Sequence, residues 1–512
     1  MPGREPLFQM PPPLMYGKAI MVKAGQLSLK GLIRVIAAMM LSGTLYHAAL
    51  AHEGLDSLLD GFDDGEPASE ERLLDGFEDL DTTEEENAGG ASTHGRAHEP
   101  KTFRLTGHIK TVGAYNFSHD APVREGTDWQ GVSSLKTEML LELEIKPTER
   151  WSFFNWLVFA SGLAGHDFIY SVKGRGSYTD EVLKTDETQT ELRELYLQAS
   201  PGTHLDIKTG RQIVVWGTSD YVRVTDTLNP LDVRTPGTTD IEDLRLPVAM
   251  SKIDYYWGPF NLSGIMIHEV RFNKTPSYGS GFYPYSQAPA REETPDPDLE
   301  NSQFALALKG RLSGWDFGLY WADIYHPDTY LENVSEGIAP VRVQKHERVK
   351  MFGASSTLVK GNWIIKAESA FWNGLKYTNT PNDEFSRLDA MAGFEYSGFT
   401  DTRITLELLN QHLFNYKSEL KNAPGSINEN QPQSIICIEK DFMHETLTLT
   451  FLAAGYGEKW QGGAYQRVSA EYDISDSLTV KAGVVFYQSG DLAVFNDIGG
   501  NDQFFLELKF SF

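Results

Sequence analysis

The sequence predicts an all-β membrane protein: a transmembrane antiparallel β-barrel of about 18 strands, with long extracellular loops and a disordered N-terminal tail. Three observations predict this fold class. From residue 102 to the end, segments of about ten to fourteen residues alternate apolar and polar side chains, as strands with one lipid-facing side do. Short and long connections alternate between the segments, and the last segment ends on Phe512. Counting the segments gives about eighteen strands, with sixteen as the alternative.

The first 51 residues have the features of a signal peptide. Cations precede an apolar run at 35–41, and Ala49-Leu50-Ala51 then forms a small-x-small cleavage site. The cations are Lys18, Lys23, Lys30 and Arg34. The prolines at 11–13 do not fit such a signal, so we expect translation to start at Met15 or Met21. The mature chain is expected to begin near His52.

Residues 52–101 predict a disordered tail on the periplasmic side of the membrane. Between residues 52 and 100 there are sixteen acidic and two basic residues, 16 − 2 giving a net charge of −14, and few aromatic residues. Such a segment cannot bury enough apolar surface to offset the entropy lost on ordering.

A short phrase occurs twice in this tail, at 58–64 and again at 73–79. Each copy places three large apolar side chains in acidic surroundings, which is typical of a docking peptide. We therefore expect the tail to bind a periplasmic protein or an inner-membrane transporter; the alternative is a duplication without function. The docking residues are Leu58, Leu59, Phe62, Leu73, Leu74 and Phe77.

Composition excludes several classes of protein and of site. A net charge of −26 argues against nucleic acid as a partner, because phosphate binding needs a basic surface. The one cysteine, Cys437, excludes a disulfide framework and lies on a predicted strand as a wall residue. The acidic tail does not fit a calcium loop, because Phe62 stands at the third ligand position. We expect no cofactor and no metal.

Period-two alternation supports a lipid-facing side on individual segments. Leu478, Val480 and Ala482 share one face, whereas Thr479 and Lys481 share the other. The segments at 135–145 and 447–453 alternate in the same way. A soluble sandwich would show this too, so the spacing of the connections decides.

The connections alternate in length, as periplasmic turns and extracellular loops do in a barrel. We expect short turns at 147–149, 201–202, 258–259, 313–314, 360–361, 399–401, 443–444 and 475–477. We expect long loops at 117–132, 161–190, 217–246, 268–301, 326–345, 373–385, 415–432 and 490–502. Trp151, Trp257, Trp315 and Trp363 lie beside short turns, where an aromatic belt would place them at the periplasmic boundary.

The last segment, 503–512, is predicted to close the barrel in the outer membrane of a Gram-negative cell. It resembles the closing strand of bacterial outer-membrane barrels, which implies recognition by the barrel assembly machinery and contact with outer-membrane lipid. Phe510 and Phe512 are the predicted assembly residues, because both stand on its wholly apolar face.

Residues 210–247 are unusually rich in Arg and Asp and carry a resemblance to a known family. The carrying residues are Gly210-Arg211-Gln212, Val215-Trp216-Gly217, Asp226, Asn229-Pro230, Asp232, Glu242-Asp243, Leu244-Arg245 and Pro247. In these the chain resembles a family of outer-membrane proteins known as domain of unknown function 1302, and more weakly it does so over most of 102–512. The resemblance implies a porin-like barrel but no agreed substrate. Members often have Glu after the Trp-Gly pair, where this chain has Thr218.

The charges of this stretch suit a loop folded into a barrel lumen. Planar guanidinium groups can pair with carboxylates across a narrow pore, and opposed charges at a constriction select solutes. Alternatively, the same pairs only pin the loop to the barrel wall, and the two readings can hold together. The predicted constriction residues are Arg211, Trp216, Asp220, Arg223, Asp226, Asp232, Arg234, Asp243 and Arg245.

These observations favour an outer-membrane channel over an enzyme. We expect passage of a small organic solute, amphiphilic or anionic, because Trp216, Tyr221 and Tyr255 would add contact area to the charges. One alternative is the outer-membrane component of a trans-envelope export system, docked through the acidic tail. The other is a barrel enzyme acting on lipid or peptide; the sequence contains no Gly-x-Ser-x-Gly and no His-Glu-x-x-His motif.

Overall fold

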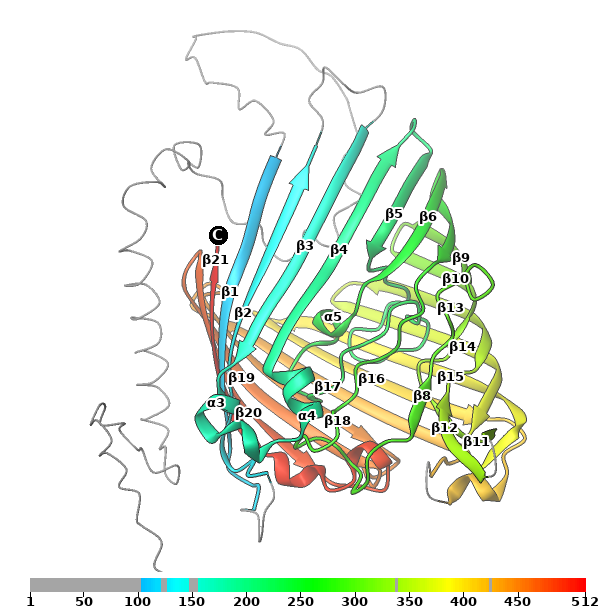
Figure 1. Ribbon diagram of the computed structural model, residues 1–512. Coiled ribbons are helices and arrows are strands. Elements are labelled where there is room, and N and C mark those ends of the chain that lie inside the picture. The colour runs from blue at the N-terminus through cyan, green and yellow to red at the C-terminus, as the bar shows by residue number, and fades with distance from the viewer. Residues whose placement is uncertain (1–102, 121–126, 147–154, 337–338, 423–425) are drawn as a thin grey trace, which may run out of the picture.

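The computed structural model describes residues 103–120, 127–146, 155–336, 339–422 and 426–512. Eighteen strands form one sheet in which every neighbouring pair is antiparallel, and pairing of β1 with β21 closes it into a barrel (Figure 1). This confirms the predicted fold class and the count of eighteen strands. No helix in the described part of the chain is long and apolar enough to cross a membrane.

The barrel strands differ in length but follow one another around the wall in chain order. They are β1 (Phe103–Asn116), β2 (Gly131–Ile145), β3 (Asn155–Asp167), β4 (Thr188–Ser200), β5 (Leu205–Gln212), β6 (Val248–Trp257), β7 (Phe260–Ile267), β9 (Gln303–Leu312), β10 (Trp315–Tyr325), β13 (Arg348–Lys360), β14 (Trp363–Tyr377), β15 (Thr380–Phe399), β16 (Thr402–Leu413), β17 (Asn430–Phe442), β18 (Leu447–Tyr456), β19 (Gly463–Ser475), β20 (Leu478–Gln488) and β21 (Gln503–Ser511).

The remaining elements are short and lie in the connections. A three-stranded sheet joins two extracellular loops: β8 (Arg291–Glu293), β11 (Tyr330–Glu336) and β12 (Ala339–Lys345). The helical turns are α3 (Ile169–Lys173), η3 (Arg175–Ser177), α4 (Asp180–Val182), η4 (Leu183–Glu187), α5 (Ile241–Leu244), η5 (Ser418–Lys421), η6 (Ala493–Phe495) and η7 (Ile498–Asn501).

The last strand closes the barrel as predicted. Nine residue pairs join β21 to β1, and beyond the ladder Gly107 and Phe512 exchange backbone hydrogen bonds of 2.9 and 3.0 Å. The side chains of Phe510 and Phe512 stay about half exposed, at 47% and 49%. Because alternate residues of a strand point to opposite faces, these exposed rings lie on the outer, lipid-facing side of the wall.

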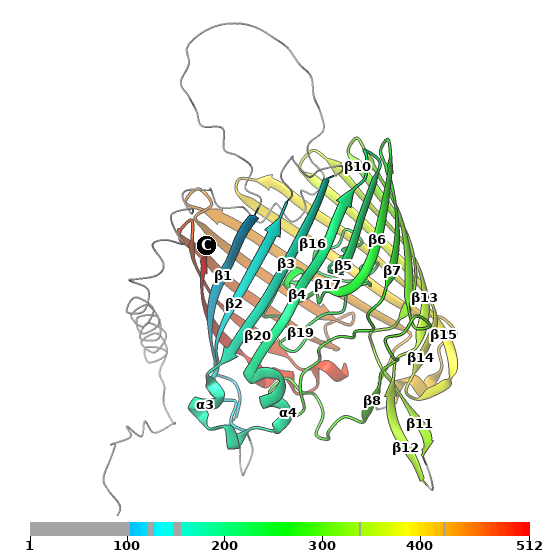
Figure 2. The same cartoon turned by 45° about the horizontal axis from the view of Figure 1, so that its top comes forward.

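Short turns gather at one end of the barrel and long loops at the other (Figure 2). Seven of the predicted short turns are confirmed, and the eighth, at 147–149, lies outside the described residues. One predicted long loop is wrong: at 373–385 the strands β14 and β15 instead continue as a hairpin with only two residues between them. Strand pairing continues there as far as Tyr377 and Thr380, through two register shifts between Asn373 and Tyr377.

The predicted aromatic belt lies at the short-turn end. Trp257 ends β6, and Trp315 and Trp363 begin β10 and β14; all three are exposed on the outer surface. Trp363 packs against Tyr396, with ring centroids 4.6 Å apart. Such rings lie at the level of the lipid headgroups, so one boundary of the membrane lies at this end of the barrel.

Several expectations fall on residues outside the described ones. These are the signal peptide, the acidic tail with its docking residues at 58–62 and 73–77, and Trp151. They stay predictions.

Candidate functional site

The segment 213–247 leaves the wall between β5 and β6 and lies inside the barrel (Figures 1 and 2). The short helix α5 lies near the end of this segment. The first part of the segment carries apolar side chains that form one buried cluster with inward residues of strands from β6 to β18. Trp216, for example, is 3% exposed and stacks on Tyr320 of β10, with ring centroids 4.9 Å apart. We call this segment the lumen loop. Apolar burial therefore fixes it against one side of the wall.

Two buried wall carboxylates hold the turn that follows Trp216. Glu368 of β14 accepts hydrogen bonds from the backbone amides of Thr218 and Ser219, the latter at 2.7 Å, and from Thr225. Glu407 of β16, which is 0% exposed, accepts the Ser219 hydroxyl at 2.6 Å and two further backbone amides. Buried carboxylates need such donors, so loop and wall satisfy each other.

A second set of contacts joins the two ends of the lumen loop, where it leaves the wall. Asn229, which is fully buried, accepts from the Val214 amide at 2.8 Å and donates to the Leu246 carbonyl at 2.9 Å, so it bridges the two ends of the loop. Arg245 pairs with Asp226 at 2.9 Å, and both are buried. Because removing one partner would leave a buried charge, this pair fixes the loop's own shape.

The far end of the lumen loop reaches the opposite part of the wall. Asp240 pairs with Arg467 of β19, and the Tyr487 hydroxyl of β20 donates to the Pro236 carbonyl at 2.6 Å. Gly237 has a φ of +77° and lies against the ring of Tyr465, where a Cβ would approach the ring to 2.7 Å. The loop thus touches the wall at its base, at β14–β16 and at β19–β20, and so subdivides the lumen.

A charged cluster joins the lumen loop to the extracellular segment between β3 and β4. Arg234 donates to Asp232 at 2.6 Å and to Asp186 at 2.8 Å. Burial works against ionisation of Asp232, but the hydrogen bonds and charge of Arg234 outweigh it and hold the pKa of Asp232 below its usual range. Burial instead dominates at Asp186 and raises its pKa.

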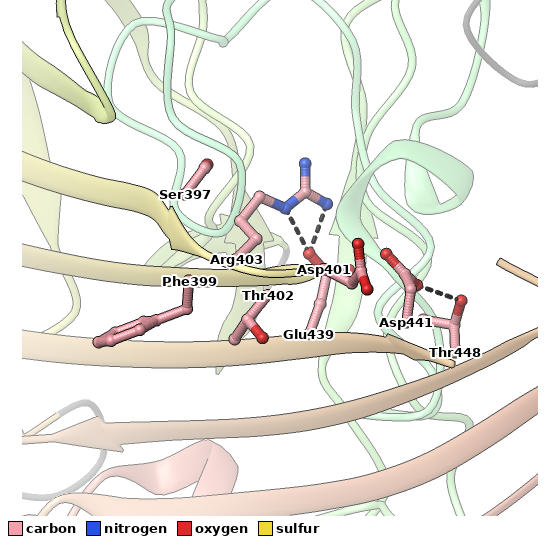
Figure 3. Close-up of a pocket in the computed structure, with 8 residues that line it drawn as sticks. All are labelled: Ser397, Phe399, Asp401, Thr402, Arg403, Glu439, Asp441 and Thr448. Atoms are coloured by element: carbon pink, nitrogen blue, oxygen red, sulfur yellow. Dashed lines mark hydrogen bonds and ion pairs between the residues drawn. The ribbon is translucent and has the colours of Figure 1, made fainter. Parts of the chain in front are cut away.

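Cavities remain on both sides of the lumen loop. Toward the extracellular end, a cavity of 210 Å³ is lined by Arg223, Trp372 and Arg387 among apolar side chains that include Ile324. Toward the short-turn end, a hollow of 490 Å³ is lined by polar residues of β15–β18. Figure 3 shows Arg403 of this hollow beside its ion-pair partner Glu439.

The structure corrects some of the predicted constriction residues. Arg211 stands on the outward face of β5, opposite the exposed Leu195, and pairs at 2.6 Å with Glu269 of an extracellular loop, so it does not face the lumen. Tyr255 is likewise outward, at 49% exposure in the aromatic belt, and offers no contact area to a solute in the lumen. Both assignments failed because the last residues of β5 and β6 could not be assigned to a face from the sequence.

The other predicted residues lie on the lumen loop but differ in exposure. Trp216, Asp226 and Arg245 are buried within it, and Arg223 donates at 2.6 Å to the Asn229 carbonyl. The predicted pairing of loop charges across a pore is wrong for these residues, because their partners belong to the loop itself. Of the predicted carboxylates, Asp220, whose side chain is 46% exposed, and Asp243 on α5 are exposed, as are Asp240, at 50%, and Glu242 beside them.

The wall residues that bind the lumen loop were not predicted from the sequence. These are Lys366, Glu368, Glu407, Arg467 and Lys481. Each occupies an inward position of its strand, and a charge at an inward position is the only signal that could have found it. Within the described residues, no group of three His, Cys, Asp or Glu side chains could hold a metal ion.

Comparison with solved structures finds similar barrels at low sequence identity. Acinetobacter baumannii OccAB2 is 8% identical, with a TM-score of 0.49, over 81% of this chain and 99% of that one. The outer membrane protein OpdK from Pseudomonas aeruginosa is 10% identical, with a TM-score of 0.47, over 80% and 98%. A BenF-like porin from Pseudomonas fluorescens Pf-5 is 10% identical, with a TM-score of 0.49, over 81% and 99%.

These likenesses say nothing of what the present chain transports. No curated protein matches the chain. A family model described as a protein of unknown function, DUF1302, matches residues 116–512, which include the lumen loop and nearly all of the barrel. The chain therefore belongs to the DUF1302 family.

Proposed function

We propose that this protein is an outer-membrane channel for a small organic solute, with the lumen loop as its constriction. The observation that carries the proposal is a charged loop fixed across the lumen of a closed barrel whose outer face is apolar. Water is expected at the charged inward side chains, because even paired ionised groups are costly to bury in a dry interior. A barrel of eighteen strands is wide enough to leave an aqueous path.

The solute class follows from the extracellular cavity. Arg223 and Arg387 line it together with the carboxylates of Asp226 and Asp389, with which they pair, while Trp372 and Ile324 offer apolar contact. A solute with an apolar body and an acidic group that takes the place of one of these carboxylates matches both features. Past the loop it meets Arg403 in the hollow at the other end.

Conductance of the purified protein in a planar bilayer tests the channel. Asp220→Asn together with Asp240→Asn removes two exposed loop charges, which leaves Arg467 without Asp240 and Lys366 with Glu395 at 3.7 Å. We expect the reversal potential in a KCl gradient to shift toward anion selectivity. The matched control is Asp296→Asn with Asp298→Asn, which removes two charges as well, from an exposed loop away from the lumen. Absence of conductance, or an equal shift in the control, would refute the proposal.

The export alternative also has a supporting observation. β1 begins, and β21 ends, at the short-turn end of the barrel, so the segment before Phe103 joins the barrel at that end. If that end faces the periplasm, a tail there could recruit a periplasmic partner.

A further inference from the structure

The wall between β4 and β5 is closed differently from the rest of the barrel. Five residue pairs join these strands, from Leu195–Arg211 to Ala199–Ile207, whereas each of the other barrel ladders contains at least eight. β5 ends at Gln212, where the chain turns into the lumen, but β4 continues toward the extracellular end. Figures 1 and 2 show β4 diverging from β5 there.

The backbone edge of β4 is left unpaired over 188–194 on this side. In the described part of the chain, no backbone hydrogen bond joins these residues to the lumen loop or to the loop after β7. Leu192 lies within this stretch, points outward and is 50% exposed. We call 188–194 and the segments facing it the β4 seam.

The β4 seam lies at the height of the outer leaflet. At about 3.3 Å per residue along strands tilted by about 45°, residues 188–194 lie roughly 14–28 Å from Ser200 at the short-turn end. The apolar band of such barrels is about 25 Å tall. Bare backbone edges are not tolerated against lipid hydrocarbon, so this stretch has to be satisfied by polar groups from the lumen side.

The contacts across the seam join side chains of β4, and not its backbone edge, to the segments that face it. Glu191 of β4 accepts from Arg271 and from Lys274, each at 2.6 Å. Arg193 donates to the Arg245 carbonyl of the lumen loop at 3.3 Å. Side-chain contacts of this kind can exchange partners without breaking a sheet, unlike the paired backbone elsewhere in the wall.

We propose that the β4 seam is a lateral portal through which an amphiphile with an anionic head passes between the lumen and the outer leaflet. The head replaces the Glu191 carboxylate as partner of Arg271 and Lys274, while the apolar chain passes beside Leu192 into lipid. Two cations, Arg271 and Lys274, pair with this one carboxylate, so an anionic head is favoured over a cationic one. This inference rests on the proposed channel and names its solute class and route.

Cross-linking the seam tests the portal. In a Cys437→Ala background, Glu191→Cys and Lys274→Cys are bridged with a short bis-maleimide. The matched control is Thr209→Cys with Ser251→Cys, which stand opposite each other in the paired β5–β6 ladder with hydroxyls 2.9 Å apart. Each protein is reconstituted in phosphatidylcholine vesicles containing a photoreactive dodecanoate, and labelling of the lumen-loop peptide containing Arg245 is measured.

Before bridging, the seam variant is expected to label, because the Glu191 carboxylate is gone and Arg271 remains as a partner for the anionic head; the effect of the bridge is measured against the same protein unbridged. Bridging the seam should then reduce labelling at least fivefold, whereas bridging the control pair should leave it unchanged. Equal labelling with the seam bridged or open, or an equal loss in the control, overturns the portal. KCl conductance of the same proteins is measured separately. If conductance persists and bridging leaves the labelling unchanged, the portal is rejected and the channel is retained. If conductance is absent, the channel is rejected.

Discussion

Replacing Glu368 by Gln should loosen the lumen loop from the wall without unfolding the barrel. Glu368 is 4% exposed and accepts from backbone amides and hydroxyls of Thr218, Ser219 and Thr225. An amide side chain keeps the shape, but it replaces one acceptor oxygen with a donor. Whichever way the amide is turned, one buried backbone N–H of the loop then loses its acceptor.

The size of the effect follows from these contacts. An unsatisfied buried donor costs about 1–3 kcal/mol. The bonds that remain change from charge-assisted to neutral, which weakens each by about 1 kcal/mol. Relief of the desolvation of a buried carboxylate offsets part of this loss. A net cost of about 2–4 kcal/mol makes the undocked loop about 30- to 1,000-fold more populated.

Amide hydrogen exchange in the folded barrel measures this population directly, because local opening sets the exchange rate. Exchange at Ser219, Asp220 and Tyr221 should rise by that factor, and the strands of the wall should keep their protection. The matched control is Glu144→Gln, an inward carboxylate of β2 that pairs with Lys146 at 2.7 Å. Unchanged loop exchange in a folded Glu368→Gln barrel would show that apolar packing alone holds the loop.

Three further predictions concern assembly, the loop turn and the tail. Phe510→Ser with Phe512→Ser should lower the fraction of heat-modifiable barrel on gels, because each ring loses about 1.5–3 kcal/mol of transfer into lipid; normal assembly would contradict this. Thr218→Glu should place a second carboxylate beside a wall carboxylate and raise loop exchange, whereas Thr218→Ser should not. We propose that Phe62→Ala with Phe77→Ala abolishes co-purification of a periplasmic partner and leaves the barrel intact; an unchanged set of partners would make the tail a solvated leader.

The outer face of the barrel could be predicted from the sequence because lipid imposes a rule on every strand. Leu478, Val480 and Ala482 must share the outer side wherever β20 pairs, and they do so. The closing strand was predictable for the same reason. The count of eighteen strands followed once short and long connections were told apart.

The contacts of the lumen could not be predicted, because they join residues far apart in the chain. Asp240 meets Arg467 at a separation of 227 residues, and Thr218 meets Glu368 at 150. A run of Arg and Asp predicts that ion pairs form, but it does not identify the partner residues, since any inward side chain of opposite charge could be the partner. Arg211 misled the prediction because it sits one residue before the end of β5, where a shift of one position reverses the face.

The distribution of apolar and charged side chains inside the barrel indicates where its water path runs. The apolar part of the lumen loop forms one cluster with inward residues of β6 to β18, where Met250, Ala322 and Met351 are fully buried. The inward faces of β1 and β2 instead carry Lys110 and Glu138, whose side chains keep part of their surface exposed. Ion pairs of this kind are stable when water solvates them and costly in a dry interior. In addition to the hollow at β15–β18, the open part of the lumen therefore includes the side along β1 and β2, whose wall continues along β3 to the β4 seam.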